Sequence, residues 1–281
     1  MTVTSATADG GPTVLPPAAF VPELASVGAM QDQDSVALFR HNWSTYQKLL
    51  HVDYLEHRLL YGALQRLLGD LAGGSTHEPL AMLDLGCGDA MQIAATLARC
   101  GCPAGSSPSL ASYTGVDVSA PALALAAEHL AFLRPACSVL LVEQDMAAYV
   151  DACAPATFNL AFASFAMHHL STLEAKTEFM RHVARSLKPG GAFVLVDIFL
   201  IEGETRAQFM LRIHASMHQA VDEGVIEPSE GSDVLDHITN FDFPEQPSDL
   251  AAAAAAAGFE GGAEWVVTDS KRLSRLVVLR K

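Results

Sequence analysis

The chain has 281 residues, a formal net charge of −15 at pH 7, and hydrophobic residues over 50% of its length. This length suffices for one large core with appendages. Only 17 residues are Lys or Arg, and they are scattered, whereas phosphate binding needs clustered basic side chains. The composition therefore disfavours nucleic acid as a partner.

Targeting and redox features indicate an intracellular protein. No apolar run reaches the roughly 18 residues of a membrane span. The first residues, MTVTSATADGGPTVLPP, lack the basic and apolar regions of a secretory signal. The 5 cysteines match no zinc or redox spacing, so we expect reduced thiols. These features predict a soluble, cytoplasmic protein with no membrane partner.

The first quarter of the chain predicts a flexible start followed by a helical cap. Residues 1–30 are rich in Ala, Pro, Thr and Gly without a period, so we expect them to be flexible. Residues 31–75 show apolar residues at helical spacing. A second helix within this cap is expected from Tyr54 to Leu68, ended by Gly69 or by the glycines at 73 and 74.

Five apolar segments alternate with helical segments between residues 76 and 200. Their sequences are PLAMLDLG, SYTGVDVS, CSVLLVEQD, TFNLAFASF and AFVLVDIFL. Ser119 is expected to cap the helix that follows the second strand, with Pro121 in its first turn. The helix before the fifth strand is expected to stop at a turn over residues 188–191. Alternating strands and helices predict a parallel sheet covered on both faces.

The remainder of the chain predicts a helical lid and a return to the core. Residues 201–247 are expected to form a helical insertion, followed by a helix capped by Ser248 and ended by Gly258. Two terminal strands then form an antiparallel hairpin. The predicted fold is α/β: a Rossmann-like, seven-stranded, mostly parallel sheet formed by residues 76–200 and 248–281, with a C-terminal antiparallel hairpin, a helical N-terminal cap and a helical insertion after strand five.

The first strand runs into a glycine turn, AMLDLGCGDAMQI. Gly86 and Gly88 permit a tight turn that brings the backbone close to a ligand. A dinucleotide fingerprint would place Gly or Ala where Met91 stands. Asp84 and Asp89 also add negative charge near the place of a diphosphate, so a cationic or zwitterionic ligand fits better.

Two further acids follow the next strands. Asp117 ends the second strand, where a carboxylate can accept from both hydroxyls of a ribose. Asp145 ends the third strand and can accept from the amine of adenine, with Met146 against the ring. The alternatives are a helix cap at Asp117 and a solvated loop acid at Asp145.

The segments LDLGCGDA, GVDVS, EQDM and LKPGGAFVLVD occur in this order and together resemble the class I S-adenosylmethionine-dependent methyltransferases. The resemblance covers residues 79–200 and the terminal strand pair. It implies S-adenosyl-L-methionine as cofactor, with its methionine moiety at the glycine turn, its ribose at the acid ending strand two and its adenine at the acid after strand three. The candidate cofactor residues are Asp84, Gly86, Cys87, Gly88, Asp117, Val118, Asp145, Met146 and Ser164; a small packing residue is the alternative for Cys87.

The methyl acceptor is expected above the end of strand four, under the N-terminal helices and the insertion. His168 and His169 in SFAMHHL are candidates for a base or an acceptor ligand. The alternative is that they begin a helix and bond only backbone. His214 and His218 have metal-compatible spacing, but no third ligand is evident, so no metal is predicted. The candidates for substrate or lid contacts, with core packing as the alternative for most, are Trp43, Tyr46, His51, Tyr54, Phe165, Met210 and His214.

The leading functional hypothesis is methyl transfer from S-adenosylmethionine to an oxygen or nitrogen of a small organic molecule. Family members that methylate amide nitrogens carry Asn/Asp-Pro-Pro-Tyr after strand four, but ASFAMHHL stands here. The alternatives are a nicotinamide-dependent oxidoreductase and a non-catalytic cofactor-binding module. A homodimer through the N-terminal helices or the insertion is left open.

Overall fold

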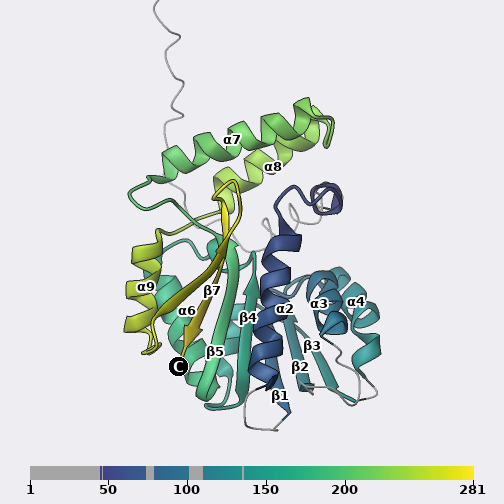
Figure 1. Cartoon of the computed structure of the whole chain (residues 1–281), viewed down its shortest axis with the longest axis vertical. Helices are drawn as coiled ribbons and strands as arrows, with labels where there is room; N and C mark the ends of the chain where they lie inside the picture. The colour runs from purple at the N-terminus through teal and green to yellow at the C-terminus, as the bar shows by residue number, and fades with distance from the viewer. Residues whose placement is uncertain (1–44, 46, 74–78, 101–109, 135) are drawn as a thin grey trace, which may run out of the picture.

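A computed structural model describes residues 45, 47–73, 79–100, 110–134 and 136–281 (Figure 1). Its centre is a seven-stranded sheet of order β3-β2-β1-β4-β5-β7-β6. Neighbouring strands among the first five are parallel, and β7 is antiparallel to both β5 and β6. The predicted fold class is confirmed. The strands are β1 Leu80–Leu85, β2 Leu110–Asp117, β3 Ser138–Glu143, β4 Phe158–Ser164, β5 Leu187–Ile198, β6 Ala263–Thr268 and β7 Ser274–Arg280.

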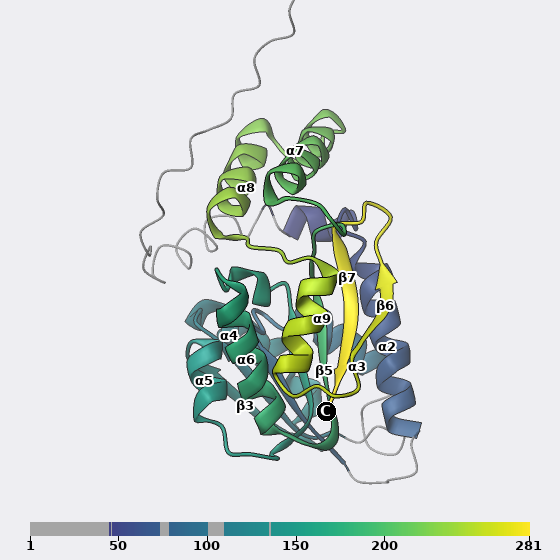
Figure 2. The same ribbon diagram turned by 90° about the vertical axis from the view of Figure 1, so that its left-hand side faces the viewer.

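Helices cover both faces of this sheet, and Figure 2 shows α2 and α6 on opposite sides of it. Helix α3 contacts both α2 and α4, and α6 contacts both α5 and α9. Helix α7 packs on α8. The helices are α2 His57–Gly73, α3 Met91–Arg99, α4 Ala120–His129, α5 Met146–Ala152, α6 Leu173–Ser186, α7 Arg206–Asp222, α8 Pro228–Phe241 and α9 Pro247–Ala256.

Two apolar cores lie on opposite faces of the sheet, because alternate side chains of each strand point to opposite faces. In β1, Met82 joins the core that contains Leu64 of α2, whereas Leu83 and Leu85 join the core that contains Phe179 of α6. Successive side chains of a strand point to opposite faces, so a strand covered on both sides is apolar throughout. Asp84, on the same face as Met82, is the exception in β1, and it lies near the carboxyl end of the strand.

Helix starts follow the capping chemistry of the sequence with two differences. The Ser119 side chain accepts from the Ala122 N–H and caps α4, as predicted. Helix α9 instead begins at Pro247, one residue before the predicted cap, because proline suits the first helical turn. The Ser248 hydroxyl donates to Glu202 at 2.5 Å. The helix expected from Tyr54 begins at His57, after a turn in which Asp53 has a φ of 58°.

The segment expected as a turn at residues 188–191 forms the first part of β5. Leu187 already pairs with Phe158 of β4, and the register shifts before Leu160 pairs with Ala192. Gly190, with a φ of 75°, lies in this irregular stretch. The strand therefore absorbs the Pro-Gly-Gly sequence as a bulge.

The helical insertion after β5 is present and lies above the carboxyl ends of the strands (Figure 1). Met217 and Ala220 of α7 pack with Leu49 of the N-terminal segment. At the base of the insertion, buried Lys176 of α6 pairs with Glu245 at 2.6 Å. The insertion and N-terminal segment therefore form a roof over the sheet. In the described part of the chain, no helix combines the length and apolar character that crossing a membrane requires.

Candidate functional site

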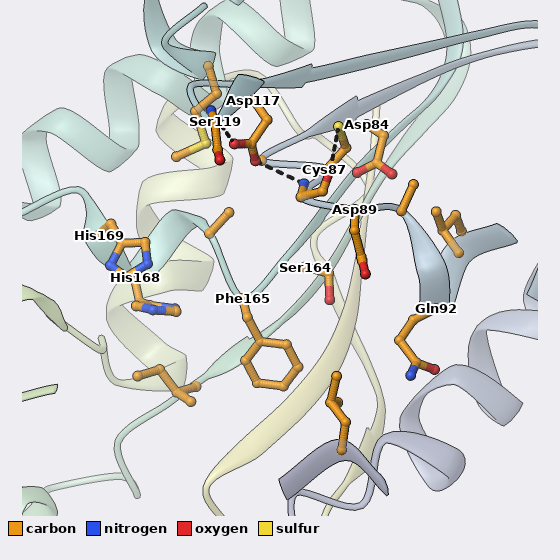
Figure 3. A pocket seen from close by; sticks show the side chains of 18 of the residues that line it. Asp84, Cys87, Asp89, Gln92, Asp117, Ser119, Ser164, Phe165, His168 and His169 are labelled. Carbon is orange, nitrogen blue, oxygen red and sulfur yellow. Dashed lines mark hydrogen bonds between the residues drawn. The ribbon is translucent and has the colours of Figure 1, made fainter. Parts of the chain in front are cut away.

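A cavity of about 370 Å³ lies between the carboxyl ends of the strands and the roof. Figure 3 shows His168 and His169 at one side of it, Asp84, Cys87 and Asp89 at the other, and Phe165 between them. All nine candidate cofactor residues border this cavity, as do Phe165, His168 and His169. The structure thus brings together residues from the ends of β1, β2, β3 and β4.

The glycine turn is held in a shape that other residues would strain. Gly86 has a φ of 72°, and a Cβ there would lie 2.5 Å from the Cβ of Ala166. The N–H groups of Gly86 and Cys87 both donate to the Val116 carbonyl, at 2.9 and 3.0 Å. A side chain at position 86 therefore cannot be added without moving the loop after β4.

Asp117 holds the glycine turn from the neighbouring strand. One carboxylate oxygen accepts from the Gly88 N–H and the other from the Ser119 N–H, both at 2.8 Å. Burial raises the pKa of Asp117, while these two bonds oppose the rise. The cap of α4 is Ser119, so Asp117 does not have the alternative role of capping that helix. Each carboxylate oxygen can accept a second hydrogen bond from a ligand in the cavity.

Asp84 is almost fully buried within β1, and Tyr113 of β2 donates a hydrogen bond to it. Burial raises the pKa of Asp84 to about 7, although the bond from Tyr113 opposes the rise. The carboxyl is therefore only partly ionised at neutral pH. Asp84 therefore repels a diphosphate less strongly than a fully ionised carboxylate would, while a nearby cation would favour its ionisation.

Asp145 is the N-cap of α5, because one of its oxygens accepts from the Ala148 N–H at 2.8 Å. It also borders the cavity, next to Met146. A Cβ on Gly86 would lie 3.8 Å from the Met146 sulfur. The glycine turn and the third strand end therefore face the same space.

Tyr61 of α2 also borders the cavity, although no sequence pattern predicted this. Its hydroxyl lies 2.7 Å from that of Ser164, with which it forms a hydrogen bond. Phe165 follows with a φ of 49°, and its ring centroid is 5.0 Å from that of His57. A positive φ is costly for an aromatic residue, so the loop after β4 is held in place by its neighbours. Helical periodicity had indicated only that α2 has a buried face.

His168 is buried between two carboxylates. Its backbone N–H donates to Asp197 at the end of β5 at 3.1 Å, and its ring Nδ1 hydrogen-bonds the other oxygen of Asp197. Its Nε2 lies 3.4 Å from Oδ1 of Asp242. Burial alone would lower the pKa of His168, but the two aspartates raise it to about 10. The alternative that this pair bonds only backbone is therefore wrong for His168.

His169 and His237 lie around the same carboxylate. His169 Nδ1 is 3.5 Å from Asp242 Oδ1 and 3.2 Å from the Phe241 carbonyl oxygen. Burial and the charge of His168 lower the pKa of His169 to about 4. His237 of α8 places Nε2 3.8 Å from Asp242 Oδ1. Asp197 could have been found as another strand-end acid, whereas His237 and Asp242 lie in an insertion without a motif.

Several candidates for substrate or lid contacts lie away from the cavity or outside the described residues. Trp43 and Tyr46 fall outside the described residues. His51 borders a separate surface hollow with Lys48 and Val225. Tyr54 is buried, and its hydroxyl donates to the Ser216 carbonyl. His51 and Tyr54 therefore do not border the cavity, whereas Tyr54 does contact the insertion through Ser216 of α7.

The insertion contacts the cavity through other residues of α7 than the two that were predicted. Ile213 and Met217 of α7 border the cavity, whereas Met210 and His214 do not. Met210 packs instead against a small core at the base of the insertion. The apolar stripe of an amphipathic helix faces inward, which leaves the histidines beside it at the margin. Among the described residues, no third metal-ligating side chain joins His214 and His218.

Known proteins share the sequence pattern and the fold. A family model described as a methyltransferase domain matches residues 83–193. A search of curated protein sequences found no match. The chain resembles a possible exported protein from Bordetella parapertussis, with a TM-score of 0.54, 19% identity, and coverage of 79% of this chain and 66% of that chain.

Two similar structures are named as O-methyltransferases. A family 2 protein from Planctomyces limnophilus, in complex with apigenin, has a TM-score of 0.55 and 13% identity over 90% of this chain and 62% of that chain. The mitomycin 7-O-methyltransferase has a TM-score of 0.51 and 14% identity, with coverage of 89% of this chain and 62% of that chain. The chain spans less than two thirds of these three structures, and the likeness at such identities is one of fold. The resemblance drawn from the sequence motifs is confirmed: residues 83–193 match the model of a methyltransferase domain, and the similar structures share the fold.

Proposed function

We propose that this protein binds S-adenosyl-L-methionine and transfers its methyl group to an oxygen or nitrogen of a small organic molecule with an apolar body. The observation that carries the proposal is that one continuous cavity joins the acidic strand ends and the glycine turn to an apolar end under the roof. The small-molecule O-methyltransferases among the similar structures support it.

The cofactor end fits the charge and shape of S-adenosylmethionine. The tight turn at Gly86 brings its backbone to the cavity wall, where the methionine moiety is proposed to lie, and Asp84 offers a carboxylate to its ammonium group. Asp117 is proposed to accept from the ribose hydroxyls, and Asp145 from the adenine amine, with Met146 against the ring. The bound cofactor supplies a methyl group already activated by its sulfonium.

The acceptor end is lined mainly by aliphatic side chains from segments far apart in the chain. Such a lining favours an apolar substrate body. The His168–His169 pair at its edge is proposed to meet the reacting oxygen or nitrogen. Alignment of that atom and exclusion of water by the roof are the main requirements of an in-line transfer. The aliphatic residues are Leu49, Leu50, Leu55, Ile198, Ile213, Met217, Val234 and Ile238.

The two alternatives fit less well. A nicotinamide-dependent oxidoreductase would need a diphosphate beside Asp89, at a turn where Met91 replaces the third glycine or alanine. A non-catalytic module that had lost its acceptor would be expected to fill the acceptor end with side chains, yet the cavity continues to Ile213 and Val234 of the roof. The cytoplasmic location and the homodimer stay predictions.

Release of S-adenosylhomocysteine during incubation with a library of aromatic and aliphatic alcohols, phenols and amines tests the transfer. We expect apolar phenols or amines to be turned over. We expect His169→Ala, and His168→Ala where it folds, to lower turnover with little change in cofactor affinity. Cofactor binding without turnover of any compound, or full turnover in both variants, would contradict the proposed acceptor end.

A further inference from the structure

Four side chains at the acceptor end of the cavity form a histidine–aspartate cluster, comprising His168, His169, His237 and Asp242. The first two follow β4, and the last two come from α8 and its C-terminal end. His168, His169 and Asp242 each place one ligand atom within 4.8 Å of the others. All four residues border the cavity. The folding of the insertion over the sheet therefore assembles a set of metal-ligating groups.

The spacing within the cluster matches metal coordination better than direct hydrogen bonding. The nearest ring nitrogens of His168, His169 and His237 lie 3.4, 3.5 and 3.8 Å from Asp242 Oδ1. A charge-assisted N–H···O bond would be about 2.7–2.9 Å long. Ligands placed about 2.0–2.1 Å from a tetrahedral ion are about 3.3 Å apart. The cluster thus leaves space for an ion between its members.

A buried polar atom without a hydrogen-bond partner points to the same space. Asp242 Oδ1 is buried and has no hydrogen-bond partner among the described residues, although three imidazoles surround it at 3.4–3.8 Å. An unsatisfied buried carboxylate oxygen costs more than an unsatisfied neutral group, so it calls for an occupant. A cation coordinated by Asp242 would satisfy this oxygen.

Asp197 provides the outer support that metal-bound histidines commonly have. It holds His168 through both the ring Nδ1 and the backbone N–H, which turns Nε2 toward Asp242. An Asp–His pair also serves as a general base, but the far nitrogen of a base faces the substrate. Here that nitrogen faces a second carboxylate with two further imidazoles around it. The arrangement resembles a carboxylate–histidine–metal relay.

We propose that the histidine–aspartate cluster binds one divalent transition-metal ion of the zinc class through His168, His169 and Asp242, with His237 beside them. An imidazole-rich set with one carboxylate suits Zn²⁺, Co²⁺ or Fe²⁺ rather than Mg²⁺ or Ca²⁺. Ligation by His169 Nδ1 would replace its contact with the Phe241 carbonyl. The proposal rests on the proposed function in one respect: a coordination position facing the cavity would receive the acceptor oxygen or nitrogen and lower its pKa.

Metal binding is tested on the full-length protein after removal of adventitious metal with a chelator. Zn²⁺ is titrated by calorimetry, and Co²⁺ by visible absorption, which reports tetrahedral nitrogen and oxygen coordination. We expect one ion per chain, a loss of affinity of at least about 100-fold in Asp242→Asn, and about 10–100-fold in Asp197→Asn. The matched control is the double variant His214→Ala/His218→Ala, which removes the other histidine pair and should bind normally.

The outcomes separate this proposal from the proposed function. No stoichiometric binding by the wild type, or unchanged affinity in Asp242→Asn, overturns the metal site. Loss of binding in the His214/His218 variant instead would assign the ion to the surface of α7 and also overturn it. S-adenosylhomocysteine binding, measured in the same samples, verifies folding of the variants. A protein that binds Zn²⁺ at the cluster but not S-adenosylhomocysteine would retain the metal site and lose the proposed function.

Discussion

The two ends of the cavity are built in opposite ways. The cofactor end consists of strand ends and one glycine turn, whose polar groups are held by backbone bonds such as those from Gly88 and Ser119 to Asp117. The acceptor end is assembled from the N-terminal segment, the loop after β4 and two helices of the insertion. The residues of the first end lie in short sequence motifs, whereas the second end depends on packing between segments far apart in the chain. Variants at the two ends should therefore affect different measurements.

The largest expected effect is at the glycine turn. Gly86→Ala would place a Cβ 2.5 Å from that of Ala166 at a φ of 72°, so we expect loss of S-adenosylhomocysteine binding by at least about 100-fold. Gly69→Ala in α2 is the matched control, because a Cβ there meets nothing within 4 Å. Calorimetry and thermal melts distinguish lost binding from lost folding. Normal affinity of Gly86→Ala for S-adenosylhomocysteine would contradict this, because it would show that the turn can accommodate a side chain.

A smaller effect is expected when a strand-end acid loses its charge. Asp117→Asn keeps the shape but can offer only one carbonyl oxygen to two N–H donors and the ribose. We expect cofactor affinity to fall about 10-fold or more, since hydrogen bonds to charged groups contribute about 1.5–3 kcal/mol. Asp145→Asn, whose oxygen mainly caps α5, should lower affinity less. The reverse ranking would contradict the assignment of ribose and adenine to these acids.

The smallest effect is a pH dependence at the cofactor end. Burial raises the pKa of Asp84 to about 7, so the free protein binds a proton there that the unfolded chain releases at lower pH. This carboxyl therefore contributes less stability as pH rises from its unfolded pKa toward 7. A positive ammonium group beside it favours the ionised form, so S-adenosylmethionine affinity should rise a few-fold between pH 6 and 8.

Asp84→Asn is the control for this pH dependence, because its amide cannot ionise. Tyr113, Cys87 and Asp117 also face Asp84, but burial raises the pKa of Tyr113 and Cys87, which keeps both neutral throughout this range. Asp117 remains in both proteins. We expect the variant to bind more weakly and with less change between the two pH values. An identical pH profile in both proteins would place the cationic group away from Asp84.

The sequence predicted the fold and the cofactor end because both follow local patterns. Strand–helix alternation indicated the sheet, and the acids at 117 and 145 stood where strands ended. The first residue of α2 was predicted too early because a turn with a positive φ at Asp53 precedes the helix. The first residue of α9 was predicted too late because Pro247 begins the helix before the expected serine cap. At the acceptor end, the sequence predicted a roof but not its contacts. Tyr61, His237 and Asp242 become neighbours of the β4 loop only through tertiary packing.

The most direct test of the central claim is calorimetric titration of the purified protein with S-adenosylmethionine, S-adenosylhomocysteine and NAD⁺. The acidic strand ends and the glycine turn predict that both sulfur nucleosides bind one per chain and that NAD⁺ does not compete. Binding of NAD⁺ with no binding of S-adenosylmethionine would contradict the account.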